Sequence, residues 1–81
     1  MTQQEIQEKI INFLVNTLEF EEKGLTPDAH MQDELGMTSL DATEMALFIR
    51  RTFGFQPQRG DIKTLTTLQS LYDYIEAHMQ K

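Results

Sequence analysis

Three segments repeat apolar residues every three or four positions, and this spacing constrains the fold more than any other feature. Such a period places apolar side chains on one face of an α-helix, whereas a strand needs sustained alternation, which the sequence lacks. The segments cover about 2–18, 39–53 and 66–79. Their apolar stripes are Ile6, Ile10, Phe13, Leu14 and Leu18; Ala42, Met45, Ala46, Ile49 and Phe53; and Leu68, Leu71, Tyr72, Ile75 and Met79.

Polar residues that favour helix ends flank these segments. Thr2 with Glu5, and Thr66 with Gln69, fit the capping-box pattern of a helix start. Gly54 is suited to end the second helix, since glycine readily adopts the left-handed conformation found there. The sequence therefore predicts an all-α fold, a four-helix bundle of three main helices plus one short helix.

The short helix is expected over 61–65, and a long connection over 19–38 joins the first two helices. Thr26 before Pro27 predicts one helical turn inside this connection. A connection of this length is uncommon in a compact domain unless it is functional. The residues expected to anchor it to the core are Leu25, Met31 and Leu35.

Size and charge narrow the class of protein. Eighty-one residues predict a single domain over 1–81, which we expect to be a monomer. The net charge of −6 argues against nucleic acid as a partner. The acidic residues concentrate in residues 1–48, which suits basic partner surfaces. No segment resembles a signal peptide or a membrane span, so we expect no membrane association and a cytoplasmic location.

Catalytic patterns are sparse. His30 and His78 are far apart in the sequence, and no nucleophile elbow or phosphate-binding glycine loop is present. The chain has no cysteine, so thiolate metal sites are excluded and any thiol must come from a cofactor. We therefore expect neither a metal site nor an enzyme.

The segment around Ser39 is the most informative. Thr38 or Ser39 is expected to cap the second helix, which leaves a hydroxyl at the surface. A helix amino end would stabilise an added phosphodiester anion by about 0.3–1 kcal/mol. Leu40 and Leu47 lie off the core stripe, and the acidic residues Asp41 and Glu44 lie between them. This mixed apolar and acidic face suits the docking of a partner.

The chain resembles the acyl carrier protein family over nearly its whole length. That family's modified serine opens helix two in an Asp-Ser-Leu motif preceded by Leu-Gly, and residues 35–41 read Leu-Gly-Met-Thr-Ser-Leu-Asp here. The long first connection is a family feature too. Further matches are Asp41, Glu44, Phe53, residues 65–69 and residues 73–75.

The resemblance implies a cofactor and partners. A phosphopantetheinyl transferase would attach 4'-phosphopantetheine from coenzyme A to Ser39, and the arm's thiol would carry acyl groups as thioesters. Acyl-transfer and synthase enzymes of fatty-acid, polyketide or other specialised lipid synthesis would then dock on helix two. In many family members the acyl chain folds back between the helices.

Two departures from the family pattern concern partner choice. Thr38 replaces the usual aspartate before the serine, and Arg50 and Arg51 end a helix that is typically acidic there. Phe48 adds a large apolar group expected to be exposed, and we include it with both arginines among the docking residues. Because like charges across an interface select partners, a specialised carrier is indicated. Alternatively, Arg51 pairs with Glu44 within the helix.

Three other functions fit parts of the sequence. An aminoacyl or peptidyl carrier would keep the fold and change the cargo. An unmodified, carrier-like adaptor would use Ser39 only as a helix cap. A helix-turn-helix binder using Arg50, Arg51 and Arg59 is disfavoured by the acidic net charge.

Overall fold

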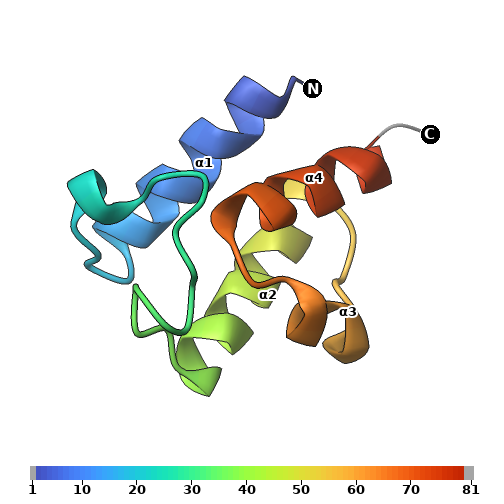
Figure 1. Cartoon of the computed structure of the whole chain (residues 1–81). Helices are drawn as coiled ribbons and strands as arrows, with labels where there is room; N and C mark the ends of the chain where they lie inside the picture. Colours follow the sequence, from blue (N-terminus) through green and yellow to red (C-terminus); the bar gives the residue numbers. More distant parts are fainter. Residues whose placement is uncertain (1, 80–81) are drawn as a thin grey trace.

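The computed structural model describes residues 2–79, apart from the side chains of Arg59 and Lys63. Within this part the regular elements are all helical, as predicted. The β-type pairing in this part is an isolated bridge between His30 and Thr67. None of the described helices is long and apolar enough to cross a bilayer. The elements are α1 (Gln3–Asn16), the 3-10 turn η1 (Glu22–Gly24), α2 (Ser39–Phe53), α3 (Arg59–Thr64) and α4 (Leu68–Met79) (Figure 1).

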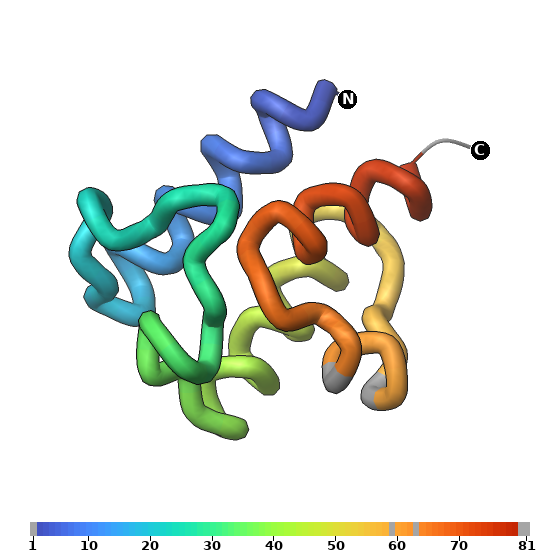
Figure 2. The backbone as a smooth tube through the Cα atoms, viewed as in Figure 1, coloured from blue at the N-terminus to red at the C-terminus, as the bar shows by residue number. Residues whose placement is uncertain are grey.

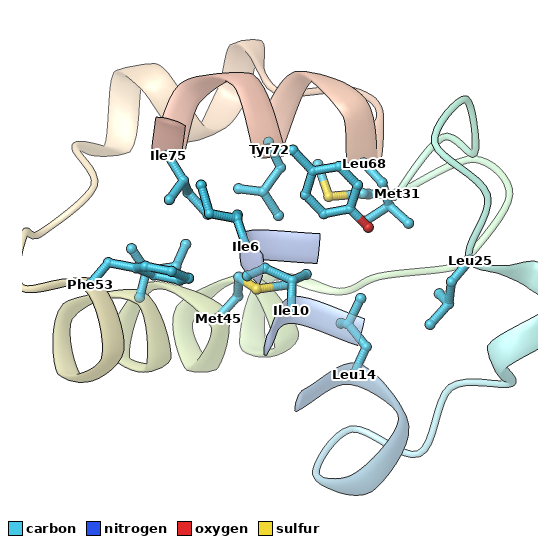
Figure 3. Close-up of a cluster of buried hydrophobic side chains, with 12 residues drawn as sticks. Ile6, Ile10, Leu14, Leu25, Met31, Met45, Phe53, Leu68, Tyr72 and Ile75 are labelled. Carbon is cyan, nitrogen blue, oxygen red and sulfur yellow. The ribbon is translucent and has the colours of Figure 1, made fainter. Parts of the chain in front are cut away.

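The core lies between the three long helices, each of which buries most of its predicted stripe. Four members of the predicted stripes are only partly buried: Phe13, Leu18, which lies beyond the end of α1, Ala42 and Met79. Figure 3 shows side chains from α1, α2, α4 and the long connection meeting in one cluster. Burial of this apolar surface is the main stabilising contribution to a domain of this size. The side chains buried to 7% exposure or less from the long helices are Ile6, Ile10, Leu14, Met45, Ala46, Ile49, Phe53, Leu68, Leu71, Tyr72 and Ile75.

Capping residues define where the first two long helices begin. Thr2 and Glu5 form the predicted capping box of α1. At α2, the Thr38 hydroxyl accepts a hydrogen bond from the Asp41 amide (3.2 Å), and the Asp41 carboxylate accepts one from the Thr38 amide (3.1 Å). Gly54 ends α2 with a φ of 84°, as its sequence position predicts.

The capping box predicted for the last helix is wrong by one residue. Thr67 and Ser70, rather than Thr66 and Gln69, exchange the hydrogen bonds at the start of α4, each 3.1 Å long. The Thr66 carbonyl instead accepts a hydrogen bond from the Met31 amide (2.8 Å). The long connection thus fixes Thr66 outside the helix.

The long connection is hydrogen-bonded to the start of α4, and Figure 2 shows the two segments side by side. The Gln69 amide donates to the Pro27 carbonyl (2.8 Å), and the Leu68 amide donates to the Ala29 carbonyl (3.2 Å). The prediction of a helical turn that starts at Thr26 is wrong. Thr26 begins a tight turn, and the helical turn of the long connection is η1, which precedes it. The predicted anchors are confirmed: Leu25 and Met31 are buried, and Leu35 packs against the core.

Among the described residues, one buried polar side-chain atom lacks a hydrogen-bond partner. The Tyr72 hydroxyl is buried, and no hydrogen-bond partner for it exists among the described residues. Burial raises the pKa of Tyr72 to about 12, because the phenolate form would be poorly solvated there. A buried hydroxyl without a partner lowers the free energy of unfolding, so removal of this hydroxyl should change the stability measurably.

Candidate functional site

The chain turns sharply into α2 through a glycine. Gly36 adopts a φ of 69°, which favours a residue without a Cβ atom. The Met37 amide then donates to the Met31 carbonyl (2.9 Å), which ties the turn to the buried part of the long connection. Thr38 follows as the N-cap. This sequence of contacts fixes the direction in which α2 begins.

Ser39 is the first residue of α2 and is exposed. Of the two candidate caps, the structure uses Thr38, so the Ser39 hydroxyl is not needed to begin the helix. The backbone carbonyl of Ser39 accepts a hydrogen bond from the Thr43 hydroxyl (3.0 Å). In Figure 1 the start of α2 lies at the edge of the molecule, far from both chain ends. An external reagent or enzyme can therefore reach this hydroxyl.

The amino end of α2 is a favourable place for one added anion. The first amides of a helix carry partial positive charge, which stabilises a phosphate group by about 0.3–1 kcal/mol. The Asp41 carboxylate already accepts a hydrogen bond from the Thr38 amide. Asp41 and Glu44 are both half-exposed on the following turn. A phosphodiester on Ser39 would therefore gain from the helix end and be opposed by these two carboxylates.

A cleft of about 600 Å³ opens beside Ser39, and Thr38, Ser39 and Thr43 lie along it. Its size falls within the range of roughly 300–1,000 Å³ typical of ligand pockets. Apolar side chains of the long connection, α2, α3 and the following turn line it, among them Met31, Met37, Ala42, Ala46, Ile62 and Leu65. An elongated apolar group attached near Ser39 would have a place to fold into.

Sequence reasoning placed Ala42 and Ala46 in the core and did not detect the cleft. The available signal is their size. Two alanines one turn apart on a stripe otherwise made of Met, Ile and Phe leave space that larger residues would fill. Both alanines line the cleft.

The prediction that Leu40 and Leu47 lie outside the core is confirmed. Leu40 is 68% exposed and Leu47 is 43% exposed, and these are the large hydrophobic side chains that the described part leaves in solvent. Glu44 lies between them, half-exposed. Exposed apolar side chains on one helix face, flanked by charge, are typical of an interaction surface.

The expected exposure of Phe48 is wrong. Its ring is partly buried, stacks on Phe13 of α1 at a centroid distance of 4.3 Å, and meets the edge of Phe53 at 6.4 Å. Stacking of this kind adds about 0.5–1.5 kcal/mol beyond the area that it buries. Phe48 therefore joins α2 to α1 and is only partly exposed.

Arg50 and Arg51 are both exposed in the last turn of α2. The alternative pairing of Arg51 with Glu44 is not formed between these two described residues, which lie two turns apart, about 10 Å along the axis. Each arginine stabilises the helix through its favourable position at the negative end of the dipole. Both charges remain available to a partner.

The two histidines lie in different settings. His30 is exposed in the long connection, whereas His78 stacks on Phe55 at 4.4 Å and approaches the Tyr74 carbonyl through Nδ1 at 2.9 Å. Within residues 2–79 no group of three potential metal-ligating side chains was found. His78 packs in an aromatic cluster with Phe55 and Tyr74 near the end of α4.

These features define a class of protein: a small helical domain that presents a free serine at a helix start beside an apolar cleft. Comparison with known proteins makes the class specific. The family described as "Phosphopantetheine attachment site" matches residues 8–75. The chain belongs to this family, whose cofactor is covalently attached phosphopantetheine.

Individual relatives agree with this family. An acyl carrier protein of Syntrophobacter fumaroxidans is 29% identical over 70 residues, covering 86% of each chain. An acyl carrier protein of Chlorobium phaeobacteroides is 29% identical over 75 residues, covering 93% of this chain and 96% of the relative. One from Coprothermobacter proteolyticus is 27% identical over 79 residues, covering 98% and 96%. The similarity thus extends over nearly the whole length of each relative.

Proposed function

We propose that this chain is an acyl carrier that bears 4'-phosphopantetheine on Ser39. The observation that carries the proposal is the exposed Ser39 hydroxyl at the first position of α2. Because the Thr38 side chain caps this helix, the Ser39 hydroxyl is not needed for capping. The family membership and the relatives named acyl carrier proteins support the same cofactor and cargo. The chain acts as a carrier, and the chemistry on its cargo belongs to partner enzymes.

Attachment of the arm is a group transfer from coenzyme A. The Ser39 oxygen attacks the phosphorus that carries the pantetheine, a new P–O bond forms, and adenosine bisphosphate leaves. The hydroxyl proton passes to a base on the phosphopantetheinyl transferase. The attached group supplies a thiol that holds an acyl chain as a thioester, which a chain without cysteine has no other means to do.

The residues around Ser39 suit this role. The first amides of α2 stabilise the phosphodiester, and Thr38 and Asp41 hold those amides in place. The apolar cleft beside Ser39 can shelter an acyl chain from water, since burial contributes about 0.8 kcal/mol for each methylene. The aminoacyl or peptidyl alternative has less support, because such polar cargo gains little from an apolar cleft.

Partner enzymes would dock on the exposed face of α2. Leu40 and Leu47 supply apolar contacts, Asp41 and Glu44 supply negative charge, and the partly exposed Phe48 extends this face. Arg50 and Arg51 add positive charge at the far end of the helix. We expect this mixed charge to suit a dedicated pathway of lipid synthesis, in the cytoplasm, rather than partners that favour uniformly acidic carriers.

The mass of the protein tests the attachment. The chain is co-expressed with a panel of phosphopantetheinyl transferases and compared with Ser39→Ala and with Thr43→Ala, which removes another exposed hydroxyl one turn along. Wild type and Thr43→Ala should gain one phosphopantetheine, and Ser39→Ala should gain none. If no transferase modifies the wild type, the chain is an unmodified adaptor and the proposal fails.

A further inference from the structure

Three methionines line the cleft beside Ser39: Met31, Met37 and Met45. Met31 and Met37 belong to the long connection, and Met45 belongs to α2. Met31 is 8% exposed and Met45 is 5% exposed, whereas Met37 is half-buried. Thioether groups from two elements therefore form part of the cleft wall. We call these three residues the cleft methionines.

The backbone that carries the cleft methionines is held by hydrogen bonds. The Met31 amide donates to the Thr66 carbonyl (2.8 Å), and the Met31 carbonyl accepts from the Met37 amide (2.9 Å). Met45 lies inside α2, away from both helix ends. Methionine is unbranched, and rotation about its side-chain bonds lets it fit irregular shapes. The cleft therefore combines a fixed frame with walls that adapt to the group they enclose.

The cleft is larger than a narrow channel between helices. Ala42 and Ala46, which lie one helix turn apart, supply only methyl groups to its wall. Ile62 and Leu65 line it from α3 and the turn that follows α3. Its volume of about 600 Å³ lies within the range of roughly 300–1,000 Å³ that encloses drug-sized ligands. The cleft therefore has room for a ring as well as for an alkyl chain.

The described side chains that line the cleft include no aromatic ring. The rings that contact one another form two other groups: Phe13, Phe48 and Phe53, and Phe55, Tyr74 and His78. A thioether sulfur makes a favourable contact with an aromatic ring about 5 Å away, often at the edge of the ring. A ring that makes such contacts inside the cleft must therefore come from a bound group.

We propose that the acyl cargo of this chain carries an aromatic ring, which binds in the cleft among Met31, Met37 and Met45. This inference rests on the proposed function and adds the chemical class of the cargo. An aryl-substituted acyl group gains from burial of its ring and from contacts with the methionine sulfur atoms. A straight alkyl chain gains from burial alone.

Hydrolysis of three thioesters tests the inference. Phenylpropanoyl, cyclohexylpropanoyl and nonanoyl groups have the same number of carbon atoms and the same two methylene groups beside the carbonyl, so their intrinsic reactivity is matched. A transferase loads each group on Ser39 from its coenzyme A thioester. Protection is the hydrolysis rate of the group on free pantetheine divided by its rate on the protein. On wild type, protection of phenylpropanoyl should equal or exceed that of the other two groups, although a phenyl ring is less hydrophobic than a saturated one.

Replacement of the sulfur atoms by carbon isolates the proposed contacts. Met37→Leu and Met45→Leu conserve side-chain volume, so each should keep the fold, which thermal unfolding checks. Each should lower protection of phenylpropanoyl by about two- to ten-fold, the range to which one sulfur–aromatic contact corresponds, and change that of cyclohexylpropanoyl by less than about two-fold. Met79→Leu, at the end of α4 and outside the cleft lining, is the matched control and should change neither.

Nuclear magnetic resonance of the wild type gives a measurement that needs no substitution. Loading with phenylpropanoyl should shift the methyl resonances of Met31, Met37 and Met45 through the ring current of the phenyl group. Loading with cyclohexylpropanoyl should not produce this shift, because a saturated ring has no ring current. The methyl resonance of Met79 should stay in place with both groups.

Three results would overturn the inference. Greater protection of nonanoyl than of phenylpropanoyl on wild type would mean that the cleft selects straight chains. Equal changes for phenylpropanoyl and cyclohexylpropanoyl in the leucine variants would mean that sulfur plays no part in binding the ring. Unshifted methyl resonances of the cleft methionines would place the ring outside the cleft. By contrast, a wild type that accepts the arm from no transferase would refute the proposed function itself.

Discussion

Two neighbouring hydroxyls at the start of α2 should differ sharply in their effect on stability. Thr38→Ala removes the hydroxyl that accepts a hydrogen bond from the Asp41 amide at 3.2 Å, so this amide loses its acceptor, while the Asp41 carboxylate can still accept from the backbone amide of residue 38. Loss of such a cap costs about 1 kcal/mol. Ser39→Ala removes an exposed hydroxyl that caps nothing and introduces a residue of higher helix propensity. It should change the free energy of unfolding by less than about 0.5 kcal/mol.

Thermal and urea unfolding followed by circular dichroism measure this difference. For a domain of 60–100 residues, 1 kcal/mol corresponds to a Tm shift of about 4–8 °C. Thr38→Ala should therefore unfold about 4–8 °C below wild type, and the Tm of Ser39→Ala should differ from that of wild type by less than about 2–4 °C. Thr38→Ser, which keeps the hydroxyl, serves as the control and should restore most of the loss.

The reasoning fails if Ser39→Ala is destabilised as much as Thr38→Ala. That result would mean that the Ser39 hydroxyl is engaged at the helix start. A hydroxyl that holds the helix would not be free to become a phosphodiester without local unfolding, so the site would lose its main support.

Two further predictions concern the core and the cleft. Tyr72→Phe should raise the free energy of unfolding by about 1 kcal/mol by removing an unpaired buried hydroxyl. Burial raises the pKa of Tyr72 from 10.0 to about 12, so between these pH values the tyrosine ionises in the unfolded chain before it ionises in the folded one. Wild type should therefore lose stability as the pH rises through this range. Urea titrations at these pH values should show a smaller loss for Tyr72→Phe. Ala46→Leu, which extends into the cleft, should accept the arm normally but speed hydrolysis of a bound medium-chain thioester, whereas Ala77→Leu on the exposed side of α4 should not. Unchanged hydrolysis in Ala46→Leu would mean that the acyl chain lies outside the cleft.

Much of the fold follows from local sequence patterns. The helical spacing of apolar residues predicts α1, α2 and α4, since each buries a single stripe. Thr2 with Glu5 and Gly54 mark helix ends because their interactions are local, within a few residues of the chain. The position of Ser39 at a helix start was predictable for the same reason.

The errors involve contacts between distant segments. The choice between Thr66 and Thr67 as the cap of α4 depends on Met31, which binds the Thr66 carbonyl. The burial of Phe48 depends on Phe13 of another helix. Spacing within one helix contains no information about either contact.

The cleft was missed for a related reason. The cleft is formed by several elements together: the long connection, α2, α3 and the turn that follows α3. The small side chains of Ala42 and Ala46 are its trace in the sequence, but alanine is also common in well-filled helices. Only the packed structure distinguishes the two cases.

The central claim is that the arm attaches to one particular hydroxyl. The chain contains two serines, Ser39 and Ser70, and trypsin would separate them into peptides 24–50 and 64–81. Fragmentation mass spectrometry of the modified protein should locate phosphopantetheine on Ser39 within the first peptide. Its location on Ser70 or on a threonine, or an intact protein that accepts the arm equally well after Ser39→Ala, would contradict the account.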